Sequence, residues 1–213
     1  MRHAKLALLL AAAALSGTAQ AALINRGGGM IYDTDRNITW LADWNYAMTS
    51  GFDPDGRMTW GNARSWANNL VFGGFDDWRL PTSLNADGSG PCGTGIVQQF
   101  NCTDSEMGHM FYTELGATAG NSILLGTNTA NLALFTNIQL SFYWTDTEYA
   151  LDTSRAWSFS MGGNQSVGPK TNPLYAVAVR NGDVAAKVPE PGIATLILAG
   201  LGALGFAARR RRY

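Results

Sequence analysis

Apolar and polar residues along the middle of the chain follow two periods, one typical of strands and one typical of helices. Residues 29–41 alternate around an Asp/Asn-rich turn, which predicts a β-hairpin. Residues 58–70 space their apolar side chains for one helical face, and Thr59 is the expected N-cap. A second helix is predicted over residues 105–115. Its inward-facing residues would be Met107, Met110, Phe111 and Leu115, followed by Gly116.

The last third of the body has the pattern of strands separated by polar turns. Its expected strands are residues 142–145, 156–160, 164–167 and 175–180. Two early helices and a late antiparallel set predict an α+β fold in one domain.

The N-terminal pattern differs, because Arg2 and Lys5 precede an uninterrupted apolar run over residues 6–15. The run ends in small residues, with Ala19 and Ala21 forming an A-x-A cleavage pattern. This arrangement is typical of a secretory signal peptide, so residues 1–21 are expected to be removed on export.

The C-terminal pattern is a second processing-like segment. Pro189, Glu190 and Pro191 precede sixteen uncharged residues, 193–208. That stretch spans roughly 24 Å as a helix, slightly less than a bilayer core of about 30 Å. A basic cluster then ends the apolar stretch and predicts a cytoplasmic end, formed by Arg209, Arg210, Arg211 and Arg212.

These three parts, in this order, resemble the PEP-CTERM sorting signal of bacteria that export proteins alongside extracellular polysaccharide. The resemblance implies an exosortase-type membrane protease as partner, cutting near the Pro-Glu-Pro motif. It makes residues 189–213 a sorting tail that holds the precursor transiently in the inner membrane. A plain, permanent C-terminal anchor is the alternative.

Residues 22–188 remain as a body long enough for one domain with a hydrophobic core. This body has nine Lys and Arg residues against fifteen Asp and Glu residues, a formal charge of −6. An acidic body argues against a nucleic-acid or polyanion partner, because those partners require clustered basic residues.

Two cysteines, Cys92 and Cys102, lie in a Gly/Asn/Thr-rich stretch. In an exported chain this even count predicts one disulfide. The alternative, a metal site, would need more ligands, and His109 is the one histidine after the predicted signal cleavage. Asp33, Asp35 and Asn37 open like a calcium loop, but the glycine and glutamate that the loop requires are missing. We therefore expect no metal and no cofactor.

Motifs across the body are similar to the domain of unknown function named after the C-terminal domain of the collagen-like adhesin Lcl. The matching segments are residues 39–41, 58–60, 66–70, 74–82, 143–150, 156–159 and 175–180. The resemblance implies a C-type-lectin-like fold with a twisted antiparallel sheet, and adhesion or glycan binding in some relatives. The acidic body departs from relatives that bind sulfated glycans, and the Glu-Pro-Asn triplet of calcium-dependent lectins is missing.

No catalytic residues are predicted, because the sequence has no G-x-S-x-G elbow and His109 has no evident partner. Asp76 and Asp77 are interpreted as structural, one of them pairing with Arg79, and Glu148 and Arg180 as another structural pair. Aromatic side chains near the late strands are the candidate glycan contacts, namely Tyr143, Trp144, Tyr149 and Trp157.

The expected protein is an exported, non-enzymatic surface or extracellular-matrix protein with a lectin-like domain that binds a neutral glycan or a protein. The alternatives are a polysaccharide-acting enzyme on the same fold and a permanently membrane-anchored envelope protein.

Overall fold

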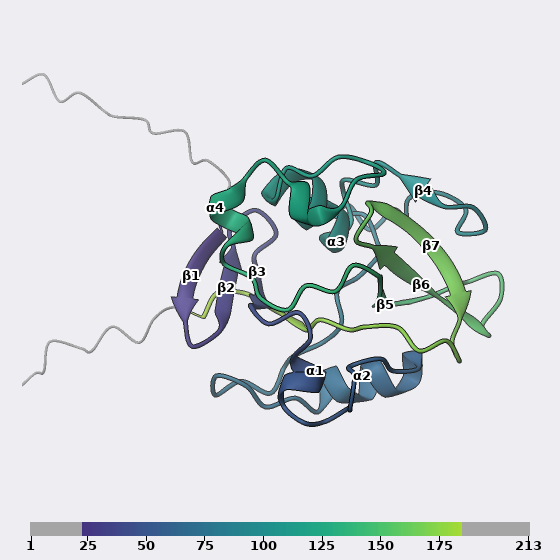
Figure 1. The fold of residues 1–213 in the computed structure, drawn as a ribbon. Coiled ribbons are helices and arrows are strands. Elements are labelled where there is room, and N and C mark those ends of the chain that lie inside the picture. Colours follow the sequence, from purple (N-terminus) through teal and green to yellow (C-terminus); the bar gives the residue numbers. More distant parts are fainter. Residues whose placement is uncertain (1–22, 185–213) are drawn as a thin grey trace, which may run out of the picture.

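A computed structural model describes residues 23–184, which form two four-stranded antiparallel sheets with short helices on either side (Figure 1). This is the α+β architecture that the sequence predicts. The predicted signal segment and the predicted C-terminal helix lie outside the described residues.

The first sheet has the strand order β1-β2-β3-β8. Its strands are β1 (Leu23–Gly27), β2 (Met30–Asp33), β3 (Ile38–Leu41) and β8 (Val179–Asn181). The predicted hairpin is confirmed, since Met30 pairs with Leu41 and Asp33 with Ile38. Strand β1 was not predicted, and it pairs along the outer edge of β2.

The second sheet has the strand order β4-β7-β6-β5. Its strands are β4 (Gln99–Phe100), β5 (Phe142–Glu148), β6 (Arg155–Ser160) and β7 (Asn164–Pro169). Three of the four late strands were predicted from their alternation. The fourth, over residues 175–180, is a strand only at its end, where β8 begins at Val179.

The stretch before β8 connects the two sheets. Tyr175 accepts a hydrogen bond from Trp144 N of β5, and Ala178 accepts one from Leu41 N of β3. Figure 1 shows this yellow-green segment crossing the width of the molecule. One extended segment therefore holds both sheets in a single unit.

Short helices lie on the two sides of this frame (Figure 1). They are α1 (Tyr46–Thr49), α2 (Trp60–Asn68), α3 (Glu106–His109), a π-helical turn η1 (Met110–Glu114), a 3-10 turn η2 (Ile123–Leu125) and α4 (Thr129–Leu132). Helix α2 begins after Thr59 as predicted, although the threonine side chain makes no capping hydrogen bond.

The core forms two clusters that contain six of the seven tryptophans and other large side chains. One cluster joins the first sheet to α3 and η1, with Ile31, Trp40 and Phe111 among its members. The other packs α2 against the second sheet, with Trp60 and Trp144 among its members. All seven tryptophans are buried, so the aromatic residues of this chain mainly build its interior.

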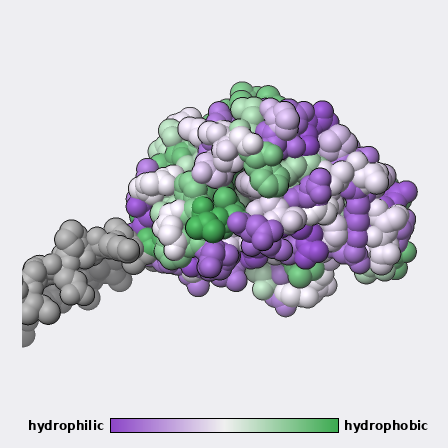
Figure 2. All heavy atoms as spheres, turned by 90° about the horizontal axis from the view of Figure 1, so that it is seen from below, coloured by the Kyte–Doolittle hydropathy of each residue, from purple (hydrophilic) through white to green (hydrophobic). Residues whose placement is uncertain are grey.

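The surface is mixed on the side that carries α1 and α2. Figure 2 shows hydrophobic residues there as separate spots between hydrophilic ones. In the described part of the chain, no helix has the length and apolar character needed to cross a membrane.

Candidate functional site

Several predicted site residues lie outside the described residues. They are Ala19 and Ala21 of the signal cleavage pattern, Pro189, Glu190 and Pro191 of the sorting motif, and Arg209, Arg210, Arg211 and Arg212 of the basic cluster.

The predicted disulfide is present. Cys92 and Cys102 are bonded, with their Cα atoms 5.6 Å apart. The loop between them packs on the second sheet, because Val167 N of β7 donates a hydrogen bond to the carbonyl of Gly95. The disulfide also lies close to α3: a Cβ atom at Gly108 would stand 1.7 Å from the carbonyl oxygen of Cys102.

The four candidate glycan contacts are buried, so the exposed rings expected from the sequence are not present. Tyr143 and Trp144 are fully buried, Trp157 is 3% exposed and Tyr149 is 7% exposed. Strand β5 lies between β6 and the connecting segment, so its side chains pack into the two cores on both faces. Sequence alternation located these strands correctly but not the solvent-facing side.

A groove does lie beside two of these aromatic residues, with a volume of about 360 Å³. It is an open groove between the turn after β5 and the disulfide loop, and we call it the hairpin groove. Its lining is Leu84, Pro91, Gly93, Thr94, Thr147, Glu148, Tyr149, Ala150, Leu151 and Trp157. Leu151 is 82% exposed at its rim, and the rings of Tyr149 and Trp157 meet edge to face at its inner wall.

The hairpin groove is close to neutral in charge. Its one charged lining residue is Glu148, which forms an ion pair with Lys170. The groove therefore offers apolar surface and threonine hydroxyls without an uncompensated charge.

A separate group of polar side chains lies in the interior, around His109. The predicted helix over residues 105–115 begins with Ser105, whose hydroxyl accepts a hydrogen bond from Gly108 N, but it changes to π-helical geometry at Met110. In an α-helix, residues five apart point about 140° away from each other. The wider turn, closed by Leu115 N donating to Met110 O, instead brings His109 and Glu114 to the same side.

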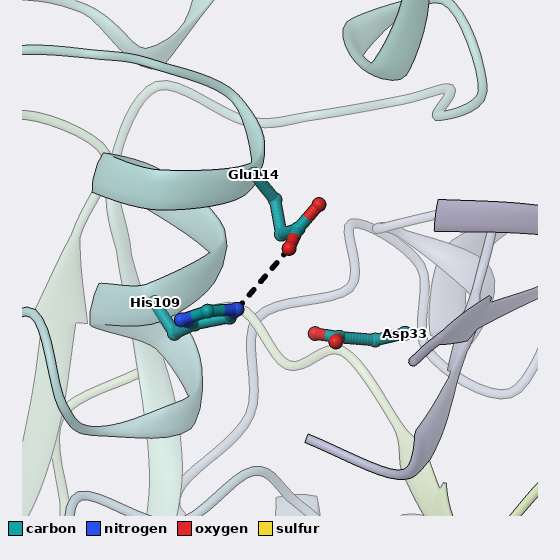
Figure 3. A group of neighbouring side chains, drawn as sticks. All are labelled: Asp33, His109 and Glu114. Atoms are coloured by element: carbon teal, nitrogen blue, oxygen red, sulfur yellow. Dashed lines mark hydrogen bonds and ion pairs between the residues drawn. The ribbon is translucent and has the colours of Figure 1, made fainter. Parts of the chain in front are cut away.

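His109, Glu114 and Asp33 converge, as Figure 3 shows. His109 Nε2 and Glu114 Oε1 are hydrogen-bonded over 3.1 Å, and Asp35 Oδ2 lies 3.8 Å from the same nitrogen. One ligand atom from each of Asp33, His109 and Glu114 lies within 4.8 Å of the others. We call these three residues, with Asp35 at their edge, the histidine cluster.

Asp33 enters the cluster from the end of β2. Its Oδ1 accepts hydrogen bonds from the backbone N–H groups of Asp35 and Arg36, which fixes the β2–β3 turn. Its Oδ2 is buried and has no hydrogen-bond partner. Burial raises the pKa of the Asp33 carboxyl, and the two backbone donors only partly oppose this shift.

The further hydrogen-bond partner of Glu114 is an uncharged amide. Asn131 of α4 donates a hydrogen bond from Nδ2 to Glu114 Oε2 over 3.2 Å. Within the described residues, neither Asp33 nor Glu114 forms an ion pair with a lysine or arginine. This grouping could not be predicted from the sequence, because Asp33 lies 76 positions before His109.

Neither predicted ion pair is present, and the residues concerned pair with other partners. Asp77 binds Arg180, Arg79 binds Glu106, and Glu148 binds Lys170. The actual partners lie 22 to 103 positions apart in the sequence, so the tertiary fold and not local spacing brings them together.

Comparison with known proteins gives one match, to the tail. Residues 187–212 match the family described as the PEP-CTERM protein-sorting motif. No curated protein matches the chain, and no solved structure matches its fold. The PEP-CTERM motif implies an exported protein whose membrane-anchored precursor is processed by an exosortase. The described body, which ends three residues before the match, is the part that such processing would release.

Proposed function

We propose that the processed chain is a non-enzymatic surface or extracellular-matrix protein whose body binds an uncharged polysaccharide. The observation that carries the proposal is the sorting motif directly after a folded, disulfide-bonded body. The resemblance of the body to the Lcl C-terminal domain, with its lectin-like fold and adhesion role, belongs to this proposal.

The hairpin groove is the surface that we assign to binding. It combines a nearly neutral lining with apolar side chains at its rim and ring edges at its wall. A neutral sugar polymer suits this lining, because the acidic body would repel a sulfated chain. Contact through Leu151 and the edges of Tyr149 and Trp157 replaces the stacking on exposed rings expected from the sequence.

A glycan array probed with the secreted, processed protein tests this assignment. We expect binding to uncharged glycans, weakened about tenfold or more by Leu151→Asp, which places a charge at the groove rim. Leu151 is 82% exposed, so the substitution leaves the core unchanged. Leu125→Asp is the matched control, because Leu125 is 72% exposed and does not line the groove.

Two results would contradict the proposal. The first is a folded, processed protein that binds no glycan on the array. The second is equal binding by the wild type and Leu151→Asp, which would place the ligand elsewhere.

A further inference from the structure

We propose that Asp33, His109 and Glu114 bind a divalent transition-metal ion that fastens the β2–β3 hairpin to the α3–η1 helix. This site is independent of the hairpin groove, so it can fail while the proposed function holds. It rests on the geometry of the cluster, on one unpartnered oxygen and on the local charge.

The geometry requires only small side-chain movements. Bonds of about 2.0–2.2 Å to a tetrahedral ion place its ligand atoms roughly 3.3–3.6 Å apart. The His109 and Glu114 ligand atoms are already 3.1 Å apart, and the ligand atoms of the three residues lie within 4.8 Å of one another. The largest separation among these atoms is therefore at most about 1–1.5 Å longer than a tetrahedral ion requires.

Asp33 Oδ2 is the second, independent observation. The oxygen is buried, has no hydrogen-bond partner and belongs to a carboxylate that faces His109 (Figure 3). Its sister oxygen is held by two backbone donors, so the carboxylate is oriented. A buried carboxylate oxygen without a donor is costly, and metal ligation is one of the few ways to satisfy it.

The charges in the cluster favour a cation. Two buried carboxylates and the partly exposed Asp35 surround one imidazole. The nearest basic side chain in this turn, Arg36, is engaged with Asp104. A divalent ion compensates two negative charges, whereas a protonated histidine compensates one.

The ligand types indicate which ion. One imidazole nitrogen with two or three carboxylate oxygens suits Zn²⁺ or Mn²⁺ better than Ca²⁺, which prefers oxygen ligands throughout. Ligation through Nε2 uses the neutral imidazole of His109 with its proton on Nδ1, a change of tautomer that releases no net proton. The Asp35 side chain is 40% exposed, so it gives the ion a route in and a further oxygen.

The π-helical turn lets three residues, and not two, converge on the site. Single π-helical turns within helices occur frequently at functional sites. Here the turn places Glu114 beside His109 on the α3–η1 helix, while Asp33 comes from strand β2 of the first sheet. Metal binding would therefore link two parts of the fold that are 76 residues apart in sequence.

Thermal unfolding and titration calorimetry of the processed protein test the site after treatment with EDTA and removal of the chelator. We expect one equivalent of Zn²⁺ or Mn²⁺ to bind. At a hundredfold excess over the dissociation constant, the melting temperature should rise by roughly 5–10 °C. Ca²⁺ and Mg²⁺ at the same concentration should give a much smaller shift.

Three variants locate the ion, namely Asp33→Asn, His109→Gln and Glu114→Gln. Each should weaken binding by about tenfold or more, since each removes one of three protein ligands. Asp33→Asn should be no less stable than the wild type without metal, because it removes a buried charge. Asp87→Asn, an exposed acid outside the cluster, is the control and should bind like the wild type.

Two outcomes would overturn the site. One is failure of the chelator-treated wild type to bind either ion. The cluster would then be a hydrogen-bonded group without a metal. The other is wild-type affinity in folded Asp33→Asn, which would place any bound ion elsewhere. The Asp33 variant remains decisive even if His109→Gln does not fold.

Discussion

Arg180 shows how single residues hold this fold together. Its guanidinium donates two hydrogen bonds to Asp77, of 2.7 and 2.9 Å, and lies 4.0 Å from the centre of the Phe75 ring. The arginine side chain is 11% exposed and the aspartate side chain 52% exposed. A bidentate pair of this kind fixes β8 to the loop before Arg79 more firmly than an exposed pair would.

The hydrogen bond from Arg180 lowers the pKa of Asp77, with burial opposing it weakly. A lowered pKa in the folded state means that the pair stabilises the fold above the ordinary aspartate value of 3.8. This stabilisation is lost as the pH falls through the folded pKa.

Asp77→Asn should therefore lower the free energy of unfolding near neutral pH by about 1 kcal/mol, a figure limited by solvent screening of the exposed carboxylate. The difference from the wild type should shrink as the pH falls below 3.8. Urea unfolding at both pH values measures it. Asp76→Asn is the matched control, because Asp76 is exposed and has no ion pair in the structure. A difference that stays constant with pH would contradict the assignment.

At the scale of elements, the segments with clear periodicity could be predicted and those held by long-range contacts could not. The β2–β3 hairpin, helix α2 and strands β5 to β7 follow directly from their patterns. Strand β1 and the short strand β4 are defined only by their partners, so their sequences alone do not identify them.

The candidate site was less predictable than the fold. The helix that carries His109 was predicted, but the π-helical turn that brings Glu114 beside it has no recognised sequence signal. Asp33 was considered only as part of a linear calcium loop. The histidine cluster needs the tertiary fold to bring its members together, and that is why sequence reasoning missed it.

The disulfide loop gives a prediction at this scale. The bond spans ten positions, and the chain-entropy treatment assigns such a loop about 2–3 kcal/mol. The double variant Cys92→Ala, Cys102→Ala should fold and lose about that much stability, because both core clusters are built mainly from other residues. Urea unfolding measures the loss, and the reduced wild type should show the same midpoint. A variant that does not fold would show that the loop is needed to form the core.

At the scale of the whole molecule, the connecting segment before β8 makes the two sheets one unit. The last described residues leave this unit next to the sorting motif at residues 187–212. A cut at Pro189 to Pro191 would therefore remove the tail without touching any described strand or helix. Export and processing are compatible with a body that is already folded.

The composition of the C-terminal tail predicts that it anchors the precursor only transiently. Its apolar stretch of sixteen residues is rich in glycine and alanine, which contribute little transfer free energy compared with leucine. Such a helix suits transient anchoring of a precursor better than permanent residence in a bilayer.

Intact-mass analysis tests this account most directly, using protein recovered from a host with the matching exosortase and from the same host without it. With the exosortase, the account predicts a chain that begins near Ala22 and ends near Pro189 or Glu190. Without it, the chain should keep its tail and remain with the membrane. Recovery of a species that retains residues 193–213 in the presence of the exosortase would contradict the account and favour a permanently anchored envelope protein.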